Sequence, residues 1–161
     1  KYDAVDSLYD ECYYLSLSLN GKCGYFSVSR KDGSVVMICE HKYDDICFDT
    51  DGMAAVRIGE KWGYIDKDGK AICEIKYDDV RHSAQPCCYE REDFDYPRLI
   101  AVCIGDKWGF VNTQGEEFGE FKFDRVDRWT SEYDGDWYVA YIGEQEYMLS
   151  EDGLRFEDRI S

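Results

Sequence analysis

The chain has 161 residues, of which 44% are apolar and 16% aromatic, so it is long and apolar enough to fold as one domain with a sizeable core. Thirty-five acidic residues against 19 basic ones give a formal net charge of −16, which repels the phosphates of nucleic acids and anionic lipid headgroups. This charge disfavours nucleic acid and membrane surfaces as partners and favours a protein that carries a basic patch.

The sequence has no run of 18 apolar residues and no basic segment followed by an apolar one at its start. Because it begins at Lys1 rather than Met, we expect it to be a fragment of a longer protein. The cysteines show no Cys-x-x-Cys pair and no small-scaffold spacing, so we expect them to be reduced and mostly buried, which favours the cytoplasm. The eight cysteines are Cys12, Cys23, Cys39, Cys47, Cys73, Cys87, Cys88 and Cys103.

A Lys-aromatic-Asp phrase recurs four times, as KYD at 1, 42 and 76 and as KFD at 122. Cutting before each phrase divides a single domain into four units, approximately 1–40, 41–74, 75–120 and 121–161. A regular set of carboxylates could hold cations, but capping of a turn by the Asp is the favoured interpretation. The apolar residue three positions after each aromatic fits a single helical turn. The repeated residues to which we assign a structural role here are Tyr43, Tyr77, Phe123, Asp44, Asp78 and Asp124.

Each unit also contains a strand that ends at a glycine-containing turn. The strands read LSLSL at 15–19, AAVRI at 54–58, IAVCI at 100–104 and YVAYI at 138–142, with apolar residues at alternate positions. The turns NGK, GEK, GDK and GEQ follow, with glycine supplying a positive φ. A three-residue turn would place Ile58 opposite Trp62 and Val56 opposite Tyr64.

The returning strands of the second and third units open with Trp62-Gly63 and Trp108-Gly109. We expect each glycine to leave a bare patch on which a side chain of another unit packs. A second turn, RKDG, DKDG, NTQG or SEDG, then leads to a third strand. Asp-x-Asp-Gly at 49–52 and 66–69 is the opening of a calcium loop, but a strand interrupts the first before Glu60 and neither continues properly, so hairpin turns are favoured.

A hairpin that reads Gly-x-Lys-Trp-Gly-Tyr-Ile-Asp, followed by Lys-Tyr-Asp-Asp, resembles the WG-containing repeat family, which is common in bacterial proteins. The resemblance covers essentially the whole chain and is closest in the second and third units. The first unit has Cys23 in place of the Trp, and the fourth has Glu146 and Tyr147 in place of the Trp-Gly pair, as expected of units that cap an array. The resemblance implies an all-β module, usually appended to other domains, without enzymatic activity.

We therefore predict an all-β fold of four tandem antiparallel hairpin or meander units, stacked as an open twisted array. Apolar residues on both faces of the hairpin AAVRI/WGYID support stacking of the units. The alternative is a small ring of four propeller-like blades. No strand from one terminus completes the unit at the other, which favours the open array.

Two irregular insertions, at 81–99 and 127–138, combine aromatic rings with acids and arginines, a mixture suited to binding a protein. The alternative is that these rings only cover the ends of a sheet. The predicted partner-binding residues are Tyr89, Phe94, Tyr96, Arg98, Trp129, Tyr133 and Trp137.

Support for catalysis is thin, because the only histidines are His41 and His82 and there is no phosphate loop, zinc-ligand spacing or nucleophile elbow. We predict no catalytic residue, no metal site and no cofactor. The favoured function is a non-enzymatic recognition module of a larger bacterial polypeptide. The alternatives are an extracellular glycan- or cell-wall-binding module and, more remotely, a cysteine hydrolase that uses Cys87 or Cys88.

Overall fold

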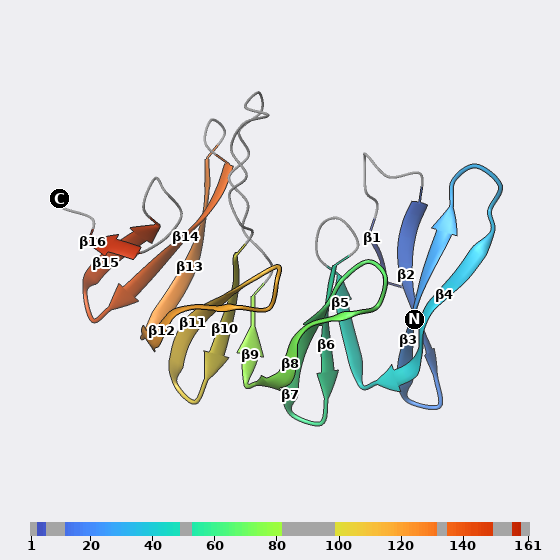
Figure 1. The fold of residues 1–161 in the computed structure, drawn as a ribbon, viewed down its shortest axis with the longest axis horizontal. Coiled ribbons are helices and arrows are strands. Elements are labelled where there is room, and N and C mark those ends of the chain that lie inside the picture. The colour runs from blue at the N-terminus through green and yellow to red at the C-terminus, as the bar shows by residue number, and fades with distance from the viewer. Residues whose placement is uncertain are drawn as a thin grey trace. The chain divides into compact units, whose positions relative to one another are not determined.

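The computed structural model describes residues 3–5, 12–48, 53–81, 99–131, 135–149 and 156–158 (Figure 1). Over these residues the chain contains no helix and forms four antiparallel, four-stranded sheets. Strands that follow one another in sequence are neighbours in each sheet, and no described sheet closes into a barrel. The prediction of an all-β fold built from tandem antiparallel hairpins is confirmed.

The chain divides into two compact halves, Lys1–Asp78 and Asp79–Ser161, with two sheets in each. The first sheet contains β1 (Asp3–Val5), β2 (Cys12–Leu19), β3 (Lys22–Ser29) and β4 (Val35–Tyr43). The second contains β5 (Asp45–Phe48), β6 (Ala54–Ile58), β7 (Lys61–Ile65) and β8 (Ala71–Tyr77). The third contains β9 (Asp79–Val80), β10 (Leu99–Ile104), β11 (Lys107–Asn112) and β12 (Glu117–Phe123). The fourth contains β13 (Arg125–Ser131), β14 (Gly135–Ile142), β15 (Gln145–Leu149) and β16 (Phe156–Asp158).

The Lys-aromatic-Asp phrase closes one sheet and opens the next. Its aromatic residue is the last residue of β4, β8 or β12 and is buried in each case. The helical turn predicted after the Asp is wrong, because Asp44 donates its backbone N–H to the carbonyl of Arg57 at 2.8 Å and Ile46 pairs with Val56 in a ladder. The backbone polar groups after the Asp are thus satisfied by sheet pairing rather than by a helix.

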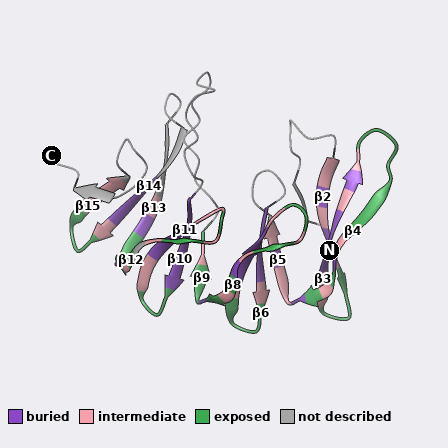
Figure 2. Ribbon diagram, in the orientation of Figure 1, coloured by how far each residue is buried: buried purple, intermediate pink, exposed green. Residues whose placement is uncertain are grey.

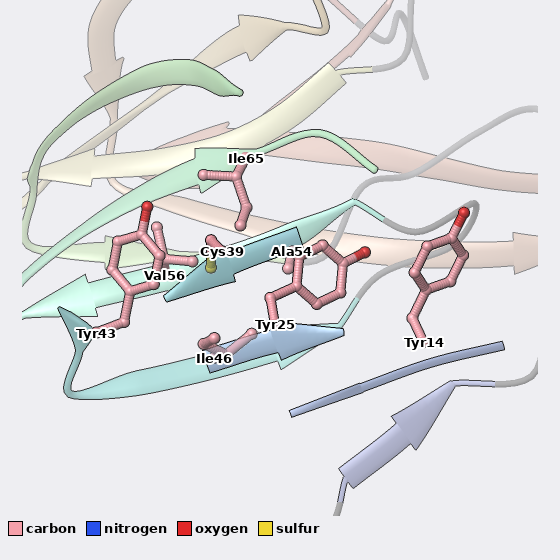
Figure 3. Close-up of a cluster of buried hydrophobic side chains, with 8 residues drawn as sticks. All are labelled: Tyr14, Tyr25, Cys39, Tyr43, Ile46, Ala54, Val56 and Ile65. Carbon is pink, nitrogen blue, oxygen red and sulfur yellow. The ribbon is translucent and has the colours of Figure 1, made fainter. Parts of the chain in front are cut away.

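The core of the N-terminal half lies between the first and second sheets (Figure 3). Ala54 and Val56, which alternate along β6, point into it, and a fully buried aliphatic side chain such as Val56 contributes about 1.5–3 kcal/mol. The rings of Tyr14 and Tyr25 extend the core along the first sheet, with centroids 5.7 Å apart. The cluster consists of Tyr14, Tyr25, Cys39 and Tyr43 from the first sheet and Ile46, Ala54, Val56 and Ile65 from the second.

The core of the C-terminal half repeats this arrangement between the third and fourth sheets. Phe110 lies at its centre, with its ring centroid 6.0 Å from that of Phe123 and 5.3 Å from that of Tyr138. The predicted face-to-face stacking of units is therefore observed within each half. The cluster consists of Leu99, Ala101, Phe110 and Phe123 from the third sheet and Val126, Tyr138 and Ala140 from the fourth.

The hairpins turn in two residues rather than three, so the predicted register is wrong by one residue. Residue Ile58 pairs with Lys61, Arg57 with Trp62, and Ala55 with Tyr64. A shift of one residue moves each side chain to the other face of a strand, so Trp62 shares a face with Arg57 and not with Ile58. The predicted positive φ of glycine is confirmed, with values of 77°, 62°, 64° and 58° at Gly21, Gly59, Gly105 and Gly143.

The glycine beside each Trp makes room for the next strand of its own sheet, not for another unit as predicted. Between the pairs Trp62–Tyr77 and Tyr64–Cys73, two steps of β7 face four steps of β8, so β8 bulges over Gly63. A Cβ on Gly63 would lie 2.8 Å from Cγ1 of Ile75 and 3.1 Å from the carbonyl oxygen of Glu74. The glycine thereby lets Ile75 pack against the core of the N-terminal half.

Candidate interaction surface

A Lys-Asp ion pair recurs beside the hairpin turns. The Lys that follows the turn donates from Nζ to Oδ1 of the Asp that ends the same sheet, and both side chains are partly exposed. The pairs are Lys22–Asp44, Lys61–Asp78 and Lys107–Asp124. The Lys after the turn and the Asp of the Lys-aromatic-Asp phrase, which lie about 20 positions apart in the sequence, therefore form one ion pair.

Two of these aspartates also hold the turn of the following sheet. Oδ2 of Asp44 accepts a hydrogen bond of 2.7 Å from the backbone N–H of Gly59, and Oδ2 of Asp124 accepts one of 2.7 Å from Gly143. The Lys, and then the glycine amide, hold the pKa of each carboxyl below its usual value. The Asp caps the hairpin of the next sheet, so it ties two sheets together rather than closing a turn of its own.

The two Trp rings of the repeat are half-buried and stacked against arginine. The guanidinium carbon of Arg57 lies 5.6 Å from the centroid of the Trp62 ring, and that of Arg81 lies 5.2 Å from the Trp108 ring. Such cation–π contacts contribute about 0.5–1 kcal/mol at partly exposed sites. Nη1 of Arg57 also donates to the carbonyl of Gly59 at 2.7 Å, so the stack supports the turn.

The acidic turn at 66–69 is closed by its own hydrogen bonds. Oδ1 of Asp66 accepts from the backbone N–H groups of Asp68 and Lys70, both at 2.9 Å, and Gly69 has a φ of 79°. Asn112 forms the same two contacts in the third sheet, with Gln114 and Glu116. This is a hairpin turn of the kind that the sequence predicts. In the described residues no three His, Cys, Asp or Glu side chains gather in a way that could hold a metal ion.

At the hairpin turns the aliphatic stripe of each sheet reaches the surface. The last residue of each strand before the turn is an exposed aliphatic. The exposed fractions are 57% for Leu19 on β2, 45% for Ile58 on β6, 42% for Ile104 on β10 and 36% for Ile142 on β14. An exposed acidic residue follows two positions later in three of the four hairpins, at the second turn position. Figure 2 shows these hairpin turns in the colour of exposed residues. We call the set the turn edge: Leu19, Ile58, Ile104, Ile142, Glu60, Asp106 and Glu144.

The turn edge was not predicted from the sequence as a surface. The one available signal was the aliphatic residue before every turn, which the alternating pattern places on one strand face with its neighbours two and four positions earlier. Val56 and Ala54 on that face are buried, whereas Ile58, the last residue of the strand, is exposed. Periodicity identifies the face of a strand but not where the covering sheet ends.

Most of the predicted partner-binding residues lie outside the described part of the chain. These are Tyr89, Phe94, Tyr96 and Arg98 in segment 82–98 and Tyr133 in segment 132–134. Trp129 on β13 and Trp137 on β14 are paired directly across the two strands. The structure therefore brings the backbones of this pair together within the fourth sheet.

The residues of the remote cysteine-hydrolase alternative, His82, Cys87 and Cys88, also lie outside the described residues. The six cysteines that the structure describes form no disulfide with one another. Cys39, Cys73 and Cys103 are buried, and burial raises the pKa of the Cys39 thiol.

Tandem four-stranded sheets with a Lys-Asp contact repeated at the sheet end define a β-repeat protein. The model of the WG containing repeat family matches residues 37–62, 62–84 and 108–133, so the chain contains repeats of this family. Each match contains one of the aspartates Asp44, Asp78 and Asp124, whereas the Lys paired with that Asp lies before the match. Repeats of this family are generally non-catalytic.

No curated protein and no solved structure matches the chain. Within the described ranges, no helix is long and apolar enough to cross a membrane.

Proposed function

We propose that the chain is a non-enzymatic recognition module that binds a protein partner with a basic surface, within a larger bacterial polypeptide. The proposal rests on the observation that the repeated polar residues have structural roles. The Lys and Asp of the repeat hold sheets and turns together, and the repeated aromatic residues are buried or stacked. The repeats thus form a scaffold, and recognition is left to side chains that the repeat does not need.

The charge of the chain supports a basic partner. A net charge of −16 attracts positively charged surfaces and accelerates their association at low ionic strength. The insertion at 81–99 and the segment 127–138 add seven candidate contact residues, which include three tyrosines and two tryptophans of the kind that is enriched in interfaces. We place the module in the cytoplasm, in keeping with eight cysteines that lack the spacing of a secreted disulfide scaffold.

The test is site-specific photo-cross-linking in the cells that produce the parent protein. A photoreactive phenylalanine analogue replaces Tyr96 in one variant and Trp137 in another. Val36, which is 59% exposed on the regular strand β4, is the matched control position. We expect both candidate positions to form an adduct with the same protein, and the control position to form none.

Two results would contradict the proposal. Absence of a protein adduct at both candidate positions of a folded domain would exclude recognition of a protein through these segments. Cosedimentation with purified cell-wall polysaccharide, in the absence of any protein adduct, would instead support the glycan-binding alternative. That result would also place the domain outside the cytoplasm.

A further inference from the structure

We propose that, within each half of the chain, the turn edge is a docking surface for a basic amphipathic helix of a partner protein. The aliphatic residues of that half would contact the apolar face of the helix. Its Lys or Arg side chains would contact Glu60 in the N-terminal half, or Asp106 and Glu144 in the C-terminal half. This inference rests on the proposed recognition function and adds a second binding surface to the insertions at 81–99 and 127–138. Segment 82–98 precedes β10 and the turn follows it, so the predicted insertion and the turn edge belong to opposite ends of that strand.

The first argument is the regular exposure of large aliphatic side chains. A single exposed Ile or Leu is ordinary on a protein surface. Here an exposed aliphatic occupies the same register position, directly before the turn, in all four sheets. Positions before a two-residue turn accept polar residues equally well, so folding does not require this choice.

The second argument is continuity with the cores. Ile58 shares a strand face with Val56 and Ala54, which belong to the core of the N-terminal half. Ile142 shares a face with Ala140 and Tyr138 of the core of the C-terminal half. Ile58 and Ile142 therefore each extend an apolar stripe out of the space between two sheets. A partner's apolar side chain placed there would bury surface against an already ordered stripe.

The spacing of the sheets indicates the form of the occupant. Sheets that stack face to face lie about 10 Å apart, so Leu19 and Ile58 in one half, and Ile104 and Ile142 in the other, recur at about that interval. Seven residues of an α-helix rise about 10.5 Å. A helix with apolar residues at heptad spacing thus matches two successive turns within a half, in the manner of helix-in-surface recognition.

The third argument is the charge of the turn edge. Glu60, Asp106 and Glu144 are exposed and take part in no ion pair within the described residues. The neighbouring Lys61 and Lys107 already form ion pairs with Asp78 and Asp124, although Lys107 also interacts electrostatically with Asp106. The surface beside the aliphatic side chains is therefore negative, which favours a helix whose polar face is basic.

The turns are also held in place before any partner binds. The carboxylate of Asp44 fixes the amide of Gly59, and that of Asp124 fixes the amide of Gly143. A surface fixed in this way loses little conformational entropy on binding. Asp44 and Asp124 thereby position two turns of the turn edge in addition to joining the sheets within each half.

The experiment measures binding of a labelled synthetic helix, with Leu at the core positions of successive heptads and Lys elsewhere, to the whole 161-residue chain. The apolar variant is Ile58→Ser with Ile104→Ser, and its control is Val36→Ser with Met37→Ser on β4, where both side chains are more than half exposed. We expect the turn-edge change to weaken binding about tenfold and the control to leave it nearly unchanged.

The charge variant combines Glu60→Gln, Asp106→Asn and Glu144→Gln. Its control, Glu40→Gln with Glu74→Gln and Glu120→Gln, removes the same charge from exposed positions of β4, β8 and β12. We expect the turn-edge set to reduce affinity about tenfold and to flatten its salt dependence more than the control. Circular dichroism of each variant checks that the chain remains folded.

Equal losses in the turn-edge and control variants would overturn the inference, because bulk charge or non-specific apolar contact would then explain the binding. The inference would also be wrong if the chain failed to bind the helix, or if a Lys-Ser peptide without apolar residues bound as tightly. These outcomes leave the proposed recognition function intact, because cross-linking at Tyr96 and Trp137 tests that function independently.

Discussion

Replacement of Gly63 by Ala should destabilise the N-terminal half by steric overlap alone. Gly63 does not have a positive φ, so an Ala can adopt its backbone conformation without strain. By lowering the conformational entropy of the unfolded chain, the Ala alone would stabilise the fold by about 0.4–1 kcal/mol. Its Cβ, however, would lie 2.8 Å from Cγ1 of Ile75, 3.1 Å from the Ile75 Cα and 3.1 Å from the Glu74 carbonyl oxygen. Two of these three atoms are backbone, so a rotamer change cannot relieve the overlap.

Overpacking of this kind costs about 1–3 kcal/mol, so after the gain in the unfolded state we expect a net loss of about 1–2 kcal/mol. Gly109→Ala is the matched comparison, because its three nearest neighbours at 2.9–3.0 Å are all ring atoms of Phe121. The Phe121 ring can swing away, so the cost there should be smaller. Combining Gly109→Ala with Phe121→Ala should remove nearly the whole overlap, whereas Ile75→Ala should rescue Gly63→Ala only in part.

The assay is urea unfolding of each variant, followed by tryptophan fluorescence and far-ultraviolet circular dichroism. The expected result is a lower midpoint for Gly63→Ala with an unchanged denaturant slope, and a coupling free energy that is larger for the Gly109–Phe121 pair than for the Gly63–Ile75 pair. A Gly63→Ala protein as stable as the original, or one fully rescued by Ile75→Ala, would refute the bulge explanation of the glycine.

Three further outcomes are expected. The pKa of Asp44 is lowered in the folded state, so the ionised carboxylate contributes fully to folding stability above about pH 4. This contribution is lost as the pH falls through the folded-state pKa. The difference in melting temperature between the original protein and Asp44→Asn should therefore shrink in acid. Alkylation followed by mass spectrometry should modify buried Cys39 more slowly than half-buried Cys12, and urea should remove the difference. Asp66→Ala should cost about 1 kcal/mol in thermal unfolding by removing two turn hydrogen bonds, whereas Asp68→Ala should change stability by less than about 0.5 kcal/mol.

The strands and their turns could be predicted from the sequence because local chemistry decides them. Alternating apolar residues at 54–58 and 100–104 form β6 and β10 with the predicted bounds within a residue, and the glycine after each has the positive φ that a tight hairpin requires. Repetition of the pattern gave the tandem architecture, since one hairpin cannot bury its own apolar faces.

The register of the hairpins could not be predicted in the same way. A sequence such as Gly-Glu-Lys fits both a two-residue and a three-residue turn, and the two differ only in whether Lys61 belongs to the strand. In the two-residue form Lys61 pairs with Ile58, and its ammonium group meets Asp78 at the end of the same sheet. That contact joins residues 17 positions apart, so no local pattern reveals it.

The candidate surfaces could likewise be predicted from the sequence only in part. Aromatic and charged insertions stand out in a sequence, and they drew the prediction to 81–99 and 127–138. The turn edge consists instead of Ile58, Ile104 and their equivalents, which look like core residues in the sequence because they continue a buried stripe. Their exposure depends on what covers the end of each strand, which the alternating pattern does not specify.

The recurrence of the Lys-Asp contact explains why the repeat keeps residues of opposite charge so far apart in sequence. At the surface such an ion pair alone would contribute little, since both side chains are partly exposed and screened by solvent. The Asp has a further role through its second carboxylate oxygen, which at Asp44 and Asp124 accepts a hydrogen bond from the amide of a turn in the next sheet. One carboxylate at each of these two positions thus serves both the Lys of its own sheet and the hairpin turn of the next, which explains why the two residues recur together.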